Sequence, residues 1–270
     1  MKPLDADRVF GGSKSPAVIG AEGEVLDSVP STMDVGRERL LAGGPDGYVV
    51  LTEHQAAGRG REGAWECPPG LGILMSAALT MGLPANEQKL IVLMGAVAAA
   101  ETARAFGVPA LIKWPNDLVV TTRCAGELRI RKFGGLLAER VARGDAAPAH
   151  ILGIGLNVNQ TEDQLPPDAR PKPTSMRLER GRELDRSNVC RALLQELDVW
   201  YRRLAMEQGE RILARWRLRS CLLGEQVNAR VGGLEVSGTV VGIRSSGELI
   251  LEDASGRQLF LSDEKTHLLL

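Results

Sequence analysis

The order of apolar segments restricts the fold of this chain more than any other feature. Five short apolar runs, bounded by glycine, proline or asparagine, are typical of strands: Tyr48–Thr52, Ile73–Leu79, Leu111–Trp114, Phe133–Ala138 and Ile151–Val158. Two longer segments predict helices. One runs from Asn86, as the cap, to Phe106, and the other from Ser187 to Met206, where apolar residues recur every three or four positions. Because strands and helices do not alternate strictly, we expect an α+β fold with a mixed, mostly antiparallel sheet and packed helices.

The sequence changes character after Cys221. Short runs joined by glycine-containing turns predict strands at Val227–Val231, Leu234–Ile243, Glu248–Leu251 and Gln258–Leu261. These strands suit a small β-barrel of about fifty residues, which is too small to be an enzyme alone. We therefore expect a large domain at residues 1–220 and a small one at 221–270. Within the large domain, Leu165–Thr174 is rich in proline and charge and predicts an irregular surface connection.

Composition limits the kind of ligand. The 33 basic and 34 acidic residues leave a net charge of -1, so global electrostatics select neither nucleic acid nor an anionic membrane. The longest apolar stretch, Leu90–Ala100, is too short to cross a bilayer as a helix. The four cysteines lack zinc-site spacing, and the first residues lack the apolar core of a signal peptide. We expect a cytoplasmic protein with a local anion site.

Residues 55–63 (QAAGRGREG) are the first candidate for that site. Gly58 and Gly60 alternate with Arg59 and Arg61, so backbone N–H groups can approach an anion while the guanidinium groups grip its oxygens. A flexible, solvated basic loop is the structural alternative. No P-loop lysine pattern and no GxGxxG motif opening a helix explains these glycines.

Residues 113–117 (KWPND) close the predicted strand that begins at Leu111. Pro115 fixes the exit turn, so that Lys113, Asn116 and Asp117 are presented from a rigid support. The structural alternative is a capped turn in which Trp114 is core and Lys113 pairs with Asp117.

Two glycine-containing strands complete the set. Lys132 stands directly before a strand that carries Gly134 and Gly135, and adjacent glycines in a strand suggest that a ligand approaches closely. Residues 151–159 (ILGIGLNVN) place small residues at every second position, and Asn157 either contacts a base or ends the strand.

In this order, the four segments resemble the biotin protein ligases of the short, monofunctional kind. The resemblance extends from Ser31-Thr32-Met33-Asp34 to the predicted barrel, at residues 238–243 (GTVVGI) and 247–249 (GEL). It implies a catalytic core similar to class II synthetases and a C-terminal SH3-like β-barrel. It also implies that biotin and ATP form biotinyl-5'-AMP with release of pyrophosphate, after which biotin passes to a lysine of a biotin carboxyl carrier protein, such as that of acetyl-CoA carboxylase.

The resemblance assigns roles to residues of this chain. Arg59, Arg61, Lys113, Asp117 and Lys132 would be catalytic. The biotin-binding residues would be Ser31, Thr32, Met33, Gln55, Gly58, Arg59, Gly60, Arg61, Lys132, Gly134 and Gly135. The ATP-binding residues would be Arg61, Trp65, Asn116, Asp117, Lys132 and Asn157, and Asp117 would hold Mg²⁺. ATP with Mg²⁺ is then the co-substrate, and no tightly bound cofactor is expected.

The resemblance bears on partners too. Dimers occur among relatives, so a homodimer is expected. Many relatives carry an N-terminal DNA-reading domain, whereas the residues before Ser31 are glycine-rich without paired helices, so no nucleic-acid partner is expected.

Two departures from the family pattern affect details. The loop before Trp65 lacks a further arginine, which bears on closure over the adenylate. Residues 124–131 (CAGELRIR) form an insertion that resembles an extended hairpin, and Lys132 rather than Arg123 matches the family lysine. The alternatives are a lipoate or octanoate transferase or ligase, which shares the fold, and a binding module that uses the barrel.

Overall fold

The computed structural model describes residues 2–11, 18–61, 63–83, 88–144, 146–262 and 266–269. The first part of the predicted helix, with its cap Asn86, lies outside these ranges. The larger sheet has eight strands in the order β1-β2-β3-β7-β6-β5-β4, with β8 paired to β6. Their bounds are Gly23–Val29 (β1), Val49–Gln55 (β2), Gly72–Leu79 (β3), Leu111–Lys113 (β4), Asp117–Cys124 (β5), Glu127–Arg143 (β6), Ala146–Asn157 (β7) and Lys172–Pro173 (β8).

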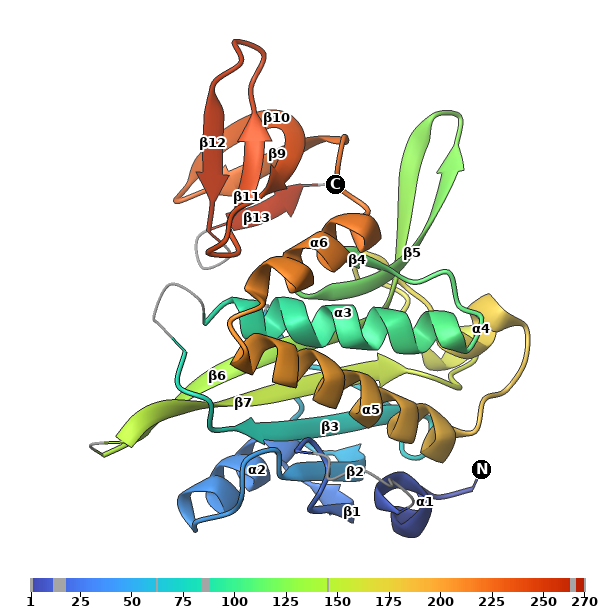
Figure 1. The fold of residues 1–270 in the computed structure, drawn as a ribbon. Coiled ribbons are helices and arrows are strands. Elements are labelled where there is room, and N and C mark those ends of the chain that lie inside the picture. Colours follow the sequence, from blue (N-terminus) through green and yellow to red (C-terminus); the bar gives the residue numbers. More distant parts are fainter. Residues whose placement is uncertain are drawn as a thin grey trace.

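Pairing in this sheet is antiparallel except between β1 and β2 and between β6 and β8. The prediction of a mixed, mostly antiparallel sheet is therefore confirmed, and the five predicted strands correspond to β2, β3, β4, β6 and β7. Strand β6 extends beyond the predicted strand at both ends. Its first residues form a projecting hairpin with β5, as expected for the insertion at residues 124–131 (Figure 1), and its last residues pair with the start of β7.

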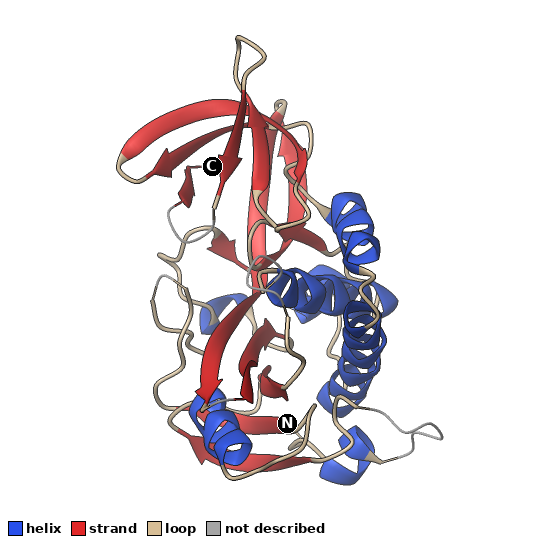
Figure 2. Cartoon of the chain, turned by 60° about the vertical axis from the view of Figure 1, so that its left-hand side comes forward, coloured by secondary structure: helices blue, strands red, loops and turns tan. Residues whose placement is uncertain are grey.

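Helices cover both faces of the sheet (Figure 1). Their bounds are Ala6–Phe10 (α1), Thr32–Leu41 (α2), Leu90–Ala105 (α3), Met176–Arg180 (α4), Arg186–Ala205 (α5) and Gly209–Arg219 (α6), with a short 3-10 helix at Glu162–Gln164. In Figure 2 most helices stand on one side of the strands. The described residues include no helix long and apolar enough to span a membrane.

Alternation along the strands builds two cores. In β7, Leu152 and Ile154 point into the large core with α3 and α5, whereas Ile151 joins a smaller core with Met33 and Leu40 of α2. Successive strand residues point to opposite faces, so Gly153, Gly155 and Asn157 share the α2 face with Ile151. This face carries the site.

The C-terminal segment forms a second, five-stranded antiparallel sheet in the order β12-β11-β10-β9-β13. Its strands are Gln226–Val231 (β9), Leu234–Ile243 (β10), Leu249–Glu252 (β11), Gln258–Leu261 (β12) and Thr266–Leu269 (β13), of which β13 was not predicted. The buried Trp114 fastens this sheet to the turn after β4, because its indole Nε1 donates to the Gly247 carbonyl at 3.1 Å.

The prediction that Leu165–Thr174 is an irregular surface connection is confirmed for its middle part, since residues 166–171 are exposed or half-buried and form no helix or strand. The two ends of the segment differ from the prediction. Leu165 and Thr174 are buried, and the end of the segment forms β8, which pairs with Arg131 and Lys132 of β6. No local pattern in the sequence predicts this long-range pairing, and Pro171 and Pro173 argue against a strand here.

Candidate active site

One large pocket, of about 1430 Å³, opens on the α2 face of the main sheet. Cations from three separated segments line it: Arg59 and Arg61 from the loop after β2, Lys113 from β4, and Lys132 from β6. The other predicted residues that line it are Ser31, Thr32, Met33, Gln55, Gly60, Trp65, Asn116, Asp117, Gly135 and Asn157. The structure thus brings together almost all of the predicted site.

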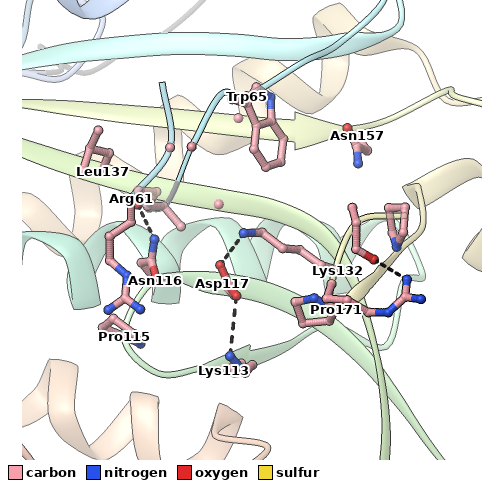
Figure 3. Close-up of a pocket in the computed structure, with 18 of the residues that line it drawn as sticks. Arg61, Trp65, Lys113, Pro115, Asn116, Asp117, Lys132, Leu137, Asn157 and Pro171 are labelled. Atoms are coloured by element: carbon pink, nitrogen blue, oxygen red, sulfur yellow. Dashed lines mark hydrogen bonds and ion pairs between the residues drawn. The ribbon is translucent and has the colours of Figure 1, made fainter. Parts of the chain in front are cut away.

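Asp117 is at the centre of the charged part of the pocket. Its Oδ1 lies 2.6 Å from Lys132 Nζ, and its Oδ2 lies 3.9 Å from Lys113 Nζ. The two lysines approach the carboxylate from different sides (Figure 3). Asp117 and Asn116 are buried, and Asn116 is held by Leu136, whose carbonyl accepts from Asn116 Nδ2 at 2.8 Å. The structural alternative for this turn, a buried Trp114 and a Lys113–Asp117 pair, is therefore present together with the pocket.

An irregularity in the β5–β6 pairing aims Lys132 at the site. Asp117 pairs with Gly135, Leu118 with Gly134 and Val119 with Lys132, so one extra residue, Phe133, bulges from β6. As a result, Lys132 lies on the same face as Gly135: a Cβ added to Gly135 would stand 3.5 Å from Lys132 Nζ. Arg123, by contrast, pairs with Glu225 at the C-terminal sheet.

The loop after β2 is a tight hairpin. Trp65 N donates to the Gly58 carbonyl at 2.9 Å, and Gly60 N donates to the Gly63 carbonyl at 2.6 Å. The guanidinium of Arg59 forms a fork on the carboxylate of Asp34 in α2, at 2.9 and 2.8 Å. This hydrogen bond lowers the pKa of Asp34 from its ordinary value. Arg59 therefore ties the loop to α2.

Polar groups gather at the start of α2. Ser31 caps the helix, since its side chain accepts from Met33 N at 3.3 Å. Gln55 Oε1 accepts from both the backbone N (2.8 Å) and the hydroxyl (3.0 Å) of Thr32. The same hydroxyl lies 2.7 Å from Ser76 Oγ. Ser76, which the sequence did not single out, thus supports this end of the pocket.

Trp65 crosses the glycine-rich part of β7. A Cβ at Gly155 would stand 2.5 Å from Trp65 Cε2, so only glycine leaves room for the indole. Trp65 Nε1 is buried and has no hydrogen-bond partner in the described part of the chain. The ring lies 5.7 Å from Lys132 Nζ, and Asn157 lines the same pocket (Figure 3). Asn157 is fixed in place, because it donates to the Thr174 carbonyl at 3.1 Å and accepts from Gln160 at 3.0 Å.

Two predicted residues do not line the pocket. Gly58 turns its Cα toward the Trp65 carbonyl, which a Cβ would approach to 2.3 Å. Gly134 faces the other side of the sheet, where a Cβ would meet Leu156 and Leu118 at 2.7 and 2.9 Å. Both glycines shape the site from behind and do not contact its contents.

The pocket also extends beyond the predicted motifs. The additional lining comes from the β5–β6 hairpin, the 166–173 segment and the C-terminal sheet: Thr122, Leu128, Arg129, Ile130, Arg131, Pro166, Ala169, Arg170, Pro171, Lys172, Pro173, Arg230, Thr266 and Leu268. No motif marks these residues, since they meet only through long-range strand pairing.

Metal-binding chemistry is sparse. The described residues contain no cluster of three or more His, Cys, Asp or Glu side chains that could hold a metal by itself. Asp117 and Glu66 are the acidic side chains among the described lining residues. Such a site suits a magnesium ion that takes most of its ligands from substrate phosphates and water.

Comparison with known proteins identifies the family. The pattern of the biotin/lipoate A/B protein ligase family matches residues 25–159, and that of the biotin protein ligase C terminal domain matches residues 222–262. The bifunctional ligase/repressor BirA of Bacillus spizizenii is 30% identical over 261 residues, covering 93% of this chain and 78% of that protein. The biotin–[acetyl-CoA-carboxylase] ligase of Paracoccus denitrificans is 32% identical over 230 residues, covering 83% of this chain and 92% of the relative.

A solved structure shares the fold. The biotin protein ligase from Aquifex aeolicus, in complex with biotin and ATP, superposes with a TM-score of 0.76 at 23% identity, covering 92% of this chain and 98% of that one. With the two family patterns and the curated relatives, the chain belongs to the biotin protein ligase family.

Proposed function

We propose that the pocket catalyses both half-reactions of a biotin protein ligase. In the first, the biotin carboxylate attacks the α-phosphorus of ATP, and pyrophosphate leaves with the electrons of the broken P–O bond. In the second, a lysine amine of a carrier protein attacks the acyl carbon of biotinyl-5'-AMP, and AMP leaves. The observation that carries the proposal is the meeting of Arg59, Arg61, Lys113 and Lys132 at one pocket.

The first step brings an anionic carboxylate against an anionic triphosphate, which repel each other. Preorganised cations lower this barrier because they stabilise the charge that develops in the transition state. We assign Lys132 to the biotin carboxylate and the bridging phosphate, since its flexible stem can leave Asp117 for a substrate oxygen. We assign Arg61 to the phosphates on the loop side, and Lys113 to Asp117, which it helps to hold in place.

Biotin has a neutral ureido ring, which needs donors and acceptors within an apolar slot. Thr32 and Gln55, already hydrogen-bonded to each other, supply such groups beside Met33. A Cβ at Gly153 would stand 2.8 Å from Met33 Sδ, so the glycine gives this side chain its space. We therefore place biotin between the start of α2 and β7.

The adenine has a separate place in the proposal. Trp65, whose Nε1 has no hydrogen-bond partner among the described residues, and the fixed amide of Asn157 lie on the same side of Lys132 (Figure 3). An aromatic face and an amide are suited to a purine. Asn116 would help to hold the nucleotide beyond them.

Magnesium would be held by Asp117 together with phosphate oxygens. When bound, it neutralises phosphate charge and polarises the α-phosphoryl group. Lys132 already occupies Asp117 Oδ1 at 2.6 Å, so movement of this lysine to the substrate frees the carboxylate.

In the second step the acceptor amine must lose a proton. Asp117 is the buried carboxylate at the reacting end of the pocket and is assigned to take that proton. The acceptor is a biotin carboxyl carrier protein or domain.

We further propose a cytoplasmic homodimer, a domain boundary at 220/221, and closure of β9–β13 into an SH3-like barrel. The boundary is supported by the end of α6 at Arg219 and the start of β9 at Gln226.

The test is acid-dependent release of pyrophosphate. Purified protein is incubated with Mg·ATP and either biotin, lipoate or octanoate, and pyrophosphate is followed over time. Release with biotin and its transfer to a carrier domain are expected. Release with lipoate or octanoate alone would contradict the proposal and favour the related acyl ligases.

A further inference from the structure

The outer part of the pocket differs in character from the part that the motifs form. We call it the outer groove and define it by the β5–β6 hairpin (Thr122, Leu128–Arg131), the 166–173 segment, and Arg230, Thr266 and Leu268 of the C-terminal sheet. A small-ligand pocket typically has about 300–1,000 Å³. The whole pocket, at about 1430 Å³, therefore leaves room beyond one adenylate.

The outer groove is strongly basic. Five of the nine lysine and arginine side chains that line the pocket lie in it: Arg129, Arg131, Arg170, Lys172 and Arg230. The described lining offers only Glu66 and Asp117 as acids, and both belong to the inner part. Because the whole chain carries a net charge of -1, this gathering is local.

Only some of these cations are neutralised by neighbours. Arg131, Lys172 and Arg230 pair with Glu179, Glu162 and Glu235 at 2.9, 3.0 and 3.0 Å. Arg129 and Arg170 are exposed and form no ion pair within the described ranges. Arg170 only donates to the neighbouring Ala169 carbonyl, at 3.0 Å. These two guanidinium groups are therefore available to bind an anion of another molecule.

The walls of the outer groove are fixed to one another. The hairpin is joined to the C-terminal sheet by the ion pair of Arg123 with Glu225. On the other side, β8 pairs with β6 at Arg131 and Lys132, which holds the 166–173 segment against the hairpin. A surface built on paired strands is preorganised, so little ordering is needed when a partner binds.

The chemistry of biotin transfer indicates which partner the outer groove contacts. After pyrophosphate has left, the adenylate retains only its bridging phosphate charge, and Lys132 and Arg61 already face that phosphate in the proposed mechanism. The outer cations then have no substrate charge to neutralise. The outer groove is continuous with Lys132 and Asp117, where the acceptor amine must arrive.

We propose that the outer groove docks the acceptor protein through an acidic surface beside its target lysine, with Arg129 and Arg170 as the principal contacts. The inference rests on the proposed function and names the partner surface that this function uses. Opposite charges raise the rate of encounter and fix orientation, so the lysine is directed toward the acyl carbon.

The experiment separates docking from chemistry. The double variant Arg129→Glu/Arg170→Glu is compared with wild type for biotin transfer from preformed adenylate to two acceptors: the biotin carboxyl carrier domain of acetyl-CoA carboxylase, and free lysine at high concentration. The ratio of the two rates should fall about tenfold and should lose most of its dependence on salt. Arg211→Glu is the matched control, because Arg211 is exposed on α6 and does not line the pocket.

A charge exchange makes the test two-sided. A carrier domain whose acidic residues beside the target lysine are replaced by lysine should react slowly with wild type and recover with the double variant. An unchanged ratio, or an equal fall in Arg211→Glu, would overturn docking at the groove. So would loss of pyrophosphate exchange in the double variant, which would assign these arginines to the triphosphate, or tight binding of duplex DNA that the variant abolishes. Absence of pyrophosphate release in wild type would instead defeat the proposed function itself.

Discussion

Lys132 Nζ lies 2.6 Å from Asp117 Oδ1, so the cation assigned to the substrate already has a carboxylate partner in the protein. That pair holds the lysine side chain in the pocket and offsets part of the negative charge of Asp117. In the proposed mechanism, the substrate oxygens therefore compete with Asp117 for Lys132, and substrate binding releases the carboxylate.

Replacement of this lysine tests the first half-reaction. Lys132→Ala should reduce biotin-dependent pyrophosphate exchange by at least about 100-fold, the usual effect of removing one transition-state donor. Lys2→Ala, at an exposed lysine outside the pocket, is the control. Exchange that persists within a few-fold of wild type would show that Lys132 does not act on the reacting phosphate.

The loop arginine has a different expected effect. Arg61→Gly should still form adenylate but release it into solution about tenfold faster, because a charge-assisted contact to the phosphate is lost. Rapid filtration of enzyme loaded with labelled biotinyl-adenylate measures the release. Equal retention of the adenylate by wild type and variant would contradict the assignment of Arg61 to the phosphate.

The Arg59–Asp34 fork predicts a smaller effect on the same release. Both side chains are more than a third exposed, at 37% and 48%, so the pair is screened by solvent. Asp34→Asn should accelerate adenylate release about two- to fivefold, in line with exposed pairs of about 0.2–1 kcal/mol. Glu38→Gln, an exposed change on the same helix, is the control.

The same pair sets a pH dependence. The hydrogen bond from Arg59 lowers the pKa of Asp34, so the contribution of the fork is complete above the ordinary aspartate pKa of 3.8. It is lost only as the pH falls through the lowered value. Wild-type release should consequently show no change from this pair between about pH 7 and 5. If wild-type release of adenylate rose between pH 7 and 5, and the Asp34→Asn variant did not show that rise, the lowered pKa of Asp34 would be contradicted.

Glycine spacing on β7 allows a matched comparison. Gly155→Ala would place a methyl group 2.5 Å from Trp65 Cε2, and a rigid indole cannot yield in place. The KM for ATP should rise about tenfold, since overpacking costs about 1–3 kcal/mol. Gly153→Ala meets only the flexible end of Met33, at 2.8 Å, and should affect the KM for biotin more than that for ATP. If Gly155→Ala instead raised mainly the KM for biotin and Gly153→Ala mainly the KM for ATP, the adenine and biotin positions would have to be exchanged.

Thiol labelling tests the packing around the site. Burial raises the pKa of Cys67 to about 11 and of Cys190 and Cys221 to about 12, whereas Cys124 is exposed on the hairpin. Because the thiolate is the reactive form, iodoacetamide at pH 8 should modify Cys124 alone in folded protein, read by mass spectrometry. As the pH rises above the ordinary value of 9.0, the unfolded state gains thiolates first, so stability should fall. Early labelling of Cys67 would show that the packing around Cys67, Gln160 and Asn157 is less tight than in this structure.

Local patterns indicated several of the residues that line the inner part of the pocket. The alternation of Gly153, Gly155 and Asn157 indicated one small-residue face, and the structure places Trp65 and Met33 over it. The resemblance to the family pattern, not a local signal, favoured Lys132 over Arg123, and the bulge at Phe133 explains how Lys132 reaches Asp117.

What could not be predicted depends on distant pairing. Strand β1 has the sequence GEVLDSV, a weak local signal that becomes a strand because β2 lies beside it in parallel. Residues 172–173 become β8 only through β6, and Arg230 reaches the pocket only because the C-terminal sheet packs near the hairpin. The residues of one segment do not indicate which distant strand it will pair with.

The bond from Trp114 Nε1 to the Gly247 carbonyl joins the small sheet to the turn that presents Lys113 and Asp117. Removal of the C-terminal segment would take away this acceptor and expose the indole beside the turn that carries Lys113 and Asp117. The small sheet thus contributes a hydrogen-bond acceptor to the packing of this turn. A chimera that takes the C-terminal segment from another relative should keep the turn at residues 113–117 unchanged only if the donor supplies a carbonyl at the position of Gly247.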